Sequence, residues 1–74
     1  MIQKIMEKRK RNRKLLGDKI RYERERSGWS RKDLAHKSRL SDNHIAQFEN
    51  GTRLPSCWNL MKLVKAFGHW KWLE

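Results

Sequence analysis

The fold is decided by residues 30–51, which read SRKDLAHKSRLSDNHIAQFENG. This stretch predicts two short helices, over residues 31–37 and 41–49, joined by a tight turn at 38–40. Each helix contains apolar residues at spacings that place them on one face, and polar residues occupy the remaining positions. The stretch therefore indicates two helices packed at a steep angle, which is the arrangement of a helix-turn-helix.

The ends of both helices carry ordinary start and stop signals. Ser30 is a good N-cap, and Asp33 three positions later completes a capping-box pattern. Ser41 is the N-cap of the second helix. Asn50-Gly51 ends that helix, because both residue types tolerate the left-handed backbone conformation. We therefore expect sharp helix boundaries on both sides of the turn.

Upstream of this unit, a helical pattern begins at Leu15 and ends at Gly28. Leu16 and Ile20 are the expected core residues of this first helix, with Tyr22 as a further candidate. The residues between them are mostly charged and face water. A first amphipathic helix therefore leads into the decisive stretch.

Downstream, the turn Leu54-Pro55-Ser56 leads into a helix that Gly68 ends. This helix repeats apolar residues at i, i+3, i+4 and i+7, the spacing of one buried stripe: Leu60, Leu63, Val64 and Phe67. The tail 69–74 forms a final turn or part of a fifth helix. No segment alternates apolar and polar residues with a period of two, the pattern of a β-strand. The expected fold is therefore all-α, a compact bundle of four or five short helices.

Length and charge limit the classes of protein. A chain of 74 residues can enclose one small core, so residues 15–74 are expected to be a single domain. The formal net charge of +11 favours a polyanionic partner, either nucleic acid or an anionic membrane surface. Residues 1–14 hold seven basic residues and one acid, a net charge of +6, and we expect them to form a flexible basic arm. Its main cations are Lys8, Arg9, Lys10, Arg11, Arg13 and Lys14.

The second helix of the pair carries polar side chains suited to reading DNA. Ala35 must be small because this helix crosses close above it, and Leu40, Ile45 and Phe48 lock the two helices together. The outward positions are then Asp42, Asn43, His44, Ala46 and Gln47. Asn and Gln pair bidentately with adenine in the major groove, and Asp accepts from cytosine N4.

The chain resembles the lambda-repressor-like, or Cro-type (XRE-type), helix-turn-helix family over roughly Leu16 to Gly68. The resemblance rests on a set of residues in a fixed order: Ile20, Arg24, Gly28, Trp29-Ser30, Leu34-Ala35, the run Ile45–Gly51, Pro55-Ser56, Leu60, Leu63 and Ala66-Phe67-Gly68.

The resemblance implies definite roles for individual residues. Asp42, Asn43 and Gln47 match positions that place side chains on base edges, with His44 and Ala46 beside them. Arg24 and Glu49 match a structural ion pair. Phosphate contacts are implied for Arg31, Ser41, Asn50, Thr52 and Arg53. One departure is Arg39, where the family often has Gly; it costs about 1 kcal/mol in a left-handed turn and adds a cation near the DNA.

The remaining noteworthy residues have structural interpretations. We interpret Cys57 and Trp29 as core residues, and Lys19, Arg21 and Arg26 as a solvated face. Exposed aromatic side chains favour partner contacts, so a homodimer through Trp58, Trp70 and Trp72 is expected. The sequence shows no pattern typical of a metal site, a cofactor site or a catalytic centre.

The functional expectation is a cytoplasmic, nucleoid-associated regulator of prokaryotic or phage origin that binds double-stranded DNA, acting as a repressor. An antitoxin or a restriction-modification controller would use the same binding mode. The rival from another class is an RNA-binding or membrane-surface protein driven by the basic arm.

Overall fold

The computed structural model describes the backbone of residues 2–73 and the side chains of residues 12–73. Its elements are α1 (Ile2–Arg26), α2 (Arg31–Ser38), α3 (Asp42–Asn50), α4 (Cys57–Phe67) and the 3₁₀ turn η1 (Lys71–Leu73). The described residues contain no β-strand. The expected all-α bundle of four helices is therefore confirmed, and the tail forms a single short turn in place of a fifth α-helix.

The helices enclose one core. Its fully buried members are Ile20 from α1, Leu34 from α2, Ile45 and Phe48 from α3, and Leu63 from α4. The other residues of the α4 stripe, Leu60, Val64 and Phe67, are partly buried and pack against this cluster. Every helix thus contributes to the core with the face that its apolar spacing predicts.

The predicted helix ends are present. The Ser30 hydroxyl accepts from the Asp33 amide, and the Asp33 carboxylate accepts from the Ser30 amide, which completes the capping box of α2. Ser41 caps α3 through the His44 amide in the same way. Arg39 adopts the left-handed conformation, with φ of 58°, and Gly51 follows α3 with φ of 75°. Local chemistry therefore fixes the turn between α2 and α3.

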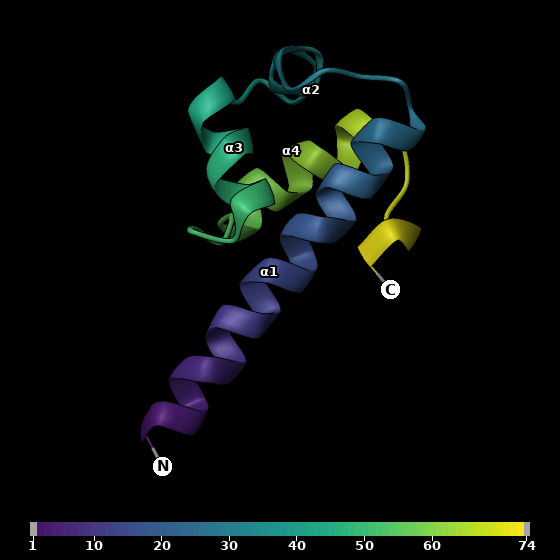
Figure 1. The fold of residues 1–74 in the computed structure, drawn as a ribbon. Helices are drawn as coiled ribbons and strands as arrows, with labels where there is room; N and C mark the ends of the chain where they lie inside the picture. The colour runs from purple at the N-terminus through teal and green to yellow at the C-terminus, as the bar shows by residue number, and fades with distance from the viewer. Residues whose placement is uncertain (1, 74) are drawn as a thin grey trace.

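α1 is longer than the sequence analysis expects, since it begins at Ile2 and not near Leu15. Its N-terminal part projects beyond the other helices, and the molecule extends 40 × 24 × 21 Å (Figure 1). No proline interrupts residues 2–26, so nothing in the backbone chemistry stops the helix. The predicted flexibility of the basic arm stays a prediction, because most of its side chains lie outside the described residues.

Two predicted core positions are wrong. Tyr22 is exposed, because it lies on the face of α1 turned away from the buried Ile20. Cys57 is also exposed. It is the first residue of α4 and precedes the buried stripe, which starts one turn later at Leu60. Neither residue contributes to the core.

The C-terminal turn returns to the body and adds to the core. The Trp72 indole is buried and meets the Phe67 ring edge-on, with ring centroids 5.1 Å apart. Trp29, which is partly buried, stacks against the same Phe67 ring, with ring centroids 5.7 Å apart. The prediction of Trp72 as a dimer contact is therefore wrong, since this side chain fills the interior. Within the part of the chain that the structure describes, none of the helices is apolar enough to cross a bilayer.

Candidate nucleic-acid interface

α2 and α3 form the helix-turn-helix, and the turn between them is held by backbone bonds. The Leu40 amide donates to the Ala35 carbonyl at 2.9 Å. Ala35 is 4% exposed, which agrees with the close crossing of the two helices. Ser38 is buried as well, and its hydroxyl donates to the Leu34 carbonyl at 2.7 Å. The polar hydroxyl is therefore satisfied within α2, and the crossing stays tightly packed.

α3 presents a polar face to solvent. Asn43, Gln47 and Asn50 are exposed and lie at i, i+4 and i+7, one face of an α-helix. Ile45, Phe48 and Glu49 lie on the opposite side and are buried. Ala46 borders the exposed face and is half-buried. The structure therefore gathers three amide side chains on one exposed surface.

Asp42 and His44 lie beside this surface. His44 makes contacts within α3, and Asp42 lies in the first turn of the helix. The His44 imidazole Nδ1 lies 2.9 Å from the Ser41 hydroxyl, and its ring stacks on Phe48 with centroids 5.9 Å apart. These contacts hold His44, which is half-buried, against the first turn of α3. Asp42 is exposed in that first turn, where the helix dipole favours a carboxylate. Among the five predicted base-reading residues, Asn43 and Gln47 thus have the most open placement.

The carboxylate of Glu49, on the buried face of α3, holds this helix against α1 and α2. Its side chain is completely buried and receives guanidinium groups from three arginines. Arg24 approaches most closely, with Nε 2.8 Å from Oε2 and Nη2 3.0 Å from Oε1. Arg21 and Arg31 each place Nε 3.4 Å from Oε1. A buried carboxylate that keeps its charge needs such compensation, so this cluster joins α1, α2 and α3 at one point.

Arg24 also fixes the loop before α2. Its Nη1 donates to the Trp29 carbonyl at 2.9 Å. The hydrogen bond to Glu49 raises the pKa of Arg24 above its usual value, although desolvation acts in the opposite direction. The pair expected between Arg24 and Glu49 is therefore present, and it belongs to a larger network that also positions the loop.

The predicted phosphate-contacting residues surround α3 and are all exposed: Arg31, Arg39, Ser41, Asn50, Thr52 and Arg53. Some of their polar groups already have partners. The Ser41 hydroxyl accepts from the His44 amide, and the Thr52 hydroxyl donates to the Gln47 carbonyl at 3.2 Å. Asn50 Oδ1 lies 3.5 Å from Arg21 Nη2. From the basic arm, Lys14 is exposed and Arg13 half-buried, whereas the side chains of Lys8, Arg9, Lys10 and Arg11 lie outside the described residues.

Several residues that hold the helices together were not predicted from the sequence. The interpretation of Lys19 and Arg21 as a solvated face is wrong, because Lys19 Nζ donates to the Leu73 carbonyl at 3.0 Å and Arg21 binds Glu49. Gly17 is buried where α1 touches α3: a Cβ atom there would lie 2.3 Å from the Phe48 carbonyl oxygen. A glycine inside a helical pattern is a recognisable signal of close packing.

Comparison with known proteins agrees with this geometry. A family model described as helix-turn-helix matches residues 20–73. The match includes α2, α3, α4 and the buried C-terminal turn, and so it covers most of the chain. No curated protein and no solved structure gives a match. The chain therefore belongs to the lambda-repressor-like helix-turn-helix family of DNA-binding regulators.

Proposed function

We propose that the chain is a sequence-specific regulator that binds double-stranded DNA by inserting α3 into the major groove, and that it acts as a repressor. The observation that carries the proposal is the exposed amide surface of Asn43, Gln47 and Asn50 on a helix anchored through Glu49. A rigidly held helix with short polar side chains suits the major groove, which admits an α-helix.

Asn43 and Gln47 are the proposed base readers. Each side-chain amide carries one donor and one acceptor, and this pair matches the N6 and N7 edge of adenine. A bidentate pair of this kind contributes about 1–3 kcal/mol of discrimination against a wrong base. Asp42, His44 and Ala46 are proposed to make flanking base contacts, with Asp42 suited to a cytosine amino group.

The cations around α3 are proposed to bind phosphates. Arg31, Arg39 and Arg53 are exposed, and Ser41, Asn50 and Thr52 lie beside them at the two ends of α3. Arg31 keeps its Nη groups for a phosphate while its Nε faces Glu49, so the carboxylate orients this guanidinium before DNA arrives. Such contacts fix the register of the protein on the duplex without reading the sequence.

The basic arm is proposed to raise affinity without adding specificity. Its seven cations would follow neighbouring phosphates and release counterions, which lowers log K by about 0.9 per contact for each decade of salt. The same charge would draw the protein to the nucleoid in the cytoplasm of a prokaryotic cell. An antitoxin or a restriction-modification controller would use the same DNA-binding mode.

Two of the three tryptophans proposed for the homodimer contact remain candidates. Trp58 and Trp70 are 68% and 57% exposed and remain candidates for a contact between two copies, whereas Trp72 is buried. A two-fold dimer would read two half-sites about one helical turn apart. Sedimentation measurements give the number of protein copies in the free protein and in its DNA complex.

Selection of bound sites from random duplex DNA tests the proposed function. The expected outcome is one short enriched motif at physiological salt. An even recovery of all sequences would contradict it. A parallel assay with anionic vesicles and with single-stranded RNA distinguishes the rival class, because a protein driven by the arm alone would bind all polyanions alike. Replacing Tyr22, which is 66% exposed on α1 and outside the proposed DNA interface, by Ala serves as the neutral control because it changes no charge.

A further inference from the structure

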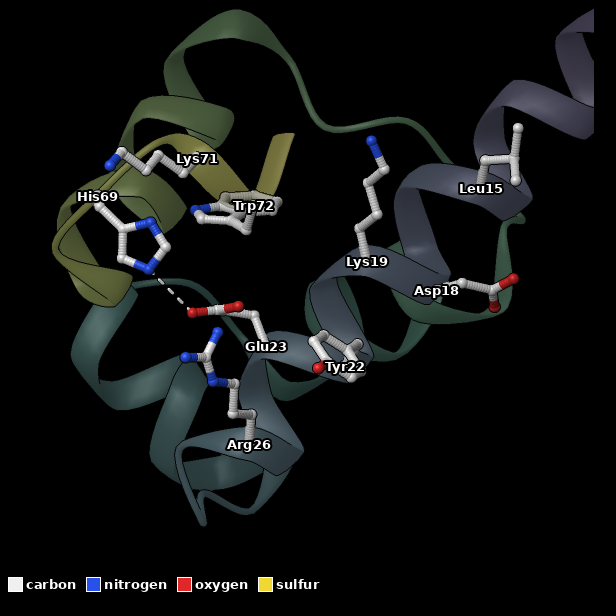
Figure 2. A pocket seen from close by; sticks show the side chains of 9 residues that line it. All are labelled: Leu15, Asp18, Lys19, Tyr22, Glu23, Arg26, His69, Lys71 and Trp72. Atoms are coloured by element: carbon white, nitrogen blue, oxygen red, sulfur yellow. Dashed lines mark hydrogen bonds and ion pairs between the residues drawn. The ribbon is translucent and has the colours of Figure 1, made fainter. Parts of the chain in front are cut away.

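A groove of about 460 Å³ lies between α1 and the C-terminal segment that contains η1 (Figure 2). None of the residues proposed to contact DNA lines it. Its volume falls in the range of about 300–1,000 Å³ that is usual for small-molecule sites. The groove thus offers a second place on the molecule where a ligand fits.

The walls of the groove are largely apolar. Leu15 and Tyr22 project from α1 and are 53% and 66% exposed, so both offer apolar surface to a ligand. The Trp72 ring closes the groove on the side of η1. A ligand with an aromatic or aliphatic tail would cover these three side chains.

Two buried nitrogens at one end of the groove have no hydrogen-bond partner. They are Trp72 Nε1 and His69 Nδ1. Trp72 is 7% exposed, and its N–H group can only donate. Figure 2 shows the nitrogen-bearing edge of this indole turned toward the side of the groove where His69 lies. An unpaired buried donor is uncommon in folded proteins, so this N–H points to an acceptor supplied from outside.

His69 is oriented by Glu23 from α1. Its Nε2 lies 3.0 Å from Glu23 Oε1, and the Glu23 side chain is almost fully buried. This contact leaves Nδ1 as the ring nitrogen available to a ligand.

The charges along the groove give it a direction. Arg26 and Lys71 stand at the end near His69, Lys19 stands between Trp72 and Leu15, and Asp18 stands near Leu15 at the other end (Figure 2). At the His69 end the two cations outnumber the Glu23 carboxylate, so this end attracts an anionic group, whereas Asp18 and Lys19 carry opposite charges toward Leu15. The groove selects a molecule with a negative head and an apolar tail.

We propose that this groove binds small organic carboxylates that carry an aromatic or aliphatic tail. The carboxylate accepts a hydrogen bond from Trp72 Nε1, near the positive charges of Arg26 and Lys71. The tail lies along Tyr22 toward Leu15. This inference goes beyond the proposed DNA-binding function and does not depend on it.

The test is an NMR titration of the full ¹⁵N-labelled chain with 4-phenylbutyrate. Each tryptophan gives one indole N–H signal, so Trp58 and Trp70 report on contacts outside the groove. The expected result is a saturating shift of the Trp72 signal with a Kd in the millimolar range. The matched cation 4-phenylbutylamine, with the same ring and chain length, is expected to bind at least tenfold more weakly.

Variants separate the groove from general attraction to a basic protein. The double change R26Q and K71Q is expected to weaken 4-phenylbutyrate binding about tenfold, whereas K62Q and K65Q, which remove two charges from α4, leave it unchanged. Trp72→Phe deletes the N–H and is expected to weaken binding about tenfold. Binding to this variant is followed by the backbone amide signals of Tyr22 and His69, because it has no Trp72 indole signal. Should that variant unfold, Tyr22→Ala removes a wall from the exposed side of the groove and is expected to weaken binding at least threefold.

Three outcomes would overturn the proposal. The first is an unshifted Trp72 signal up to tens of millimolar 4-phenylbutyrate. The second is equal binding of the amine, which would indicate ring contact without carboxylate recognition. The third is an equal loss in the K62Q and K65Q control, which would indicate non-specific charge attraction only.

Discussion

Replacing Gly17 by Ala tests how closely α1 and α3 pack. The added Cβ atom would lie 2.3 Å from the Phe48 carbonyl oxygen and 2.7 Å from that of Glu49. Real Cβ contacts stay above about 3.0 Å, so the two helices must separate by about 0.7 Å at this point. Both neighbours are backbone atoms, and no side-chain rotation relieves the clash.

The expected loss combines two opposing effects. Alanine in a helix interior is favoured over glycine by about 1 kcal/mol. Overpacking of a core costs about 1–3 kcal/mol, and a backbone contact of this kind belongs at the upper end. The net destabilisation is therefore about 2 kcal/mol, which lowers the Tm of a domain of this size by about 8–16 °C.

Thermal unfolding followed by circular dichroism measures this change. Gly28→Ala is the matched control, because its φ is +76° but a Cβ there meets no atom within 4 Å. We expect it to cost only the strain of a left-handed residue, about 1 kcal/mol. A Gly17→Ala protein as stable as the wild type, or more so, would refute the close packing, since helix propensity alone would then decide the outcome.

Three further predictions concern the helix-turn-helix. Glu49→Ala should lower the free energy of unfolding in urea by about 3–5 kcal/mol, because it leaves three guanidinium groups without their buried carboxylate; a loss below about 1 kcal/mol would mean that the cluster is not structural. Arg39→Gly should raise the Tm by about 4–8 °C, because glycine relieves the left-handed strain of about 1 kcal/mol, and a fall in Tm would contradict that reasoning. The hydrogen bond from the Ser30 amide lowers the pKa of Asp33, so the capping box stabilises the fold above the ordinary aspartate pKa and loses this contribution as the pH falls through the lowered value. The stability difference between the wild type and Asp33→Asn should therefore shrink in urea titrations between pH 5 and pH 2, and a constant difference would oppose the prediction.

The caps of α2 and α3 were the most predictable part of the structure. Ser30 and Asp33 are three residues apart, and Ser41 precedes its partner amide by the same spacing, so the contacts that define the caps are local in the chain. The left-handed conformation of Arg39 was implied by the family resemblance, because relatives often have Gly at this position. These cap contacts can be predicted from the sequence because each depends on only a few neighbouring residues.

Contacts between distant residues were harder to predict. The pairing of Arg24 with Glu49 came from family resemblance, but nothing in the sequence indicated that Arg21 and Arg31 would meet the same carboxylate. Their convergence depends on how α1, α2 and α3 cross. A charged residue on a helix is predicted to be solvent-exposed as long as the position of the neighbouring helix is unknown.

Burial at the element ends was also unpredictable. Cys57 matched an apolar family position, yet it begins α4 and is exposed, whereas Trp72 looked like a surface contact and is buried against Phe67. The burial of Trp72 depends on where the chain turns after Gly68, and the exposure of Cys57 on its place one turn before the buried stripe of α4. Spacing within one helix does not determine the burial of Trp72.

The most direct test of the proposed recognition helix is a comparison of binding motifs selected by the wild type and by Gln47→Ala. Gln47 is exposed in the middle of α3 and takes no part in the Glu49 cluster, so its removal should leave the fold intact. The account predicts that the selected motif keeps its length and loses preference at one base pair, at a cost of about 1–3 kcal/mol for the original site. An unchanged motif bound with unchanged affinity would contradict the claim that this face of α3 reads DNA.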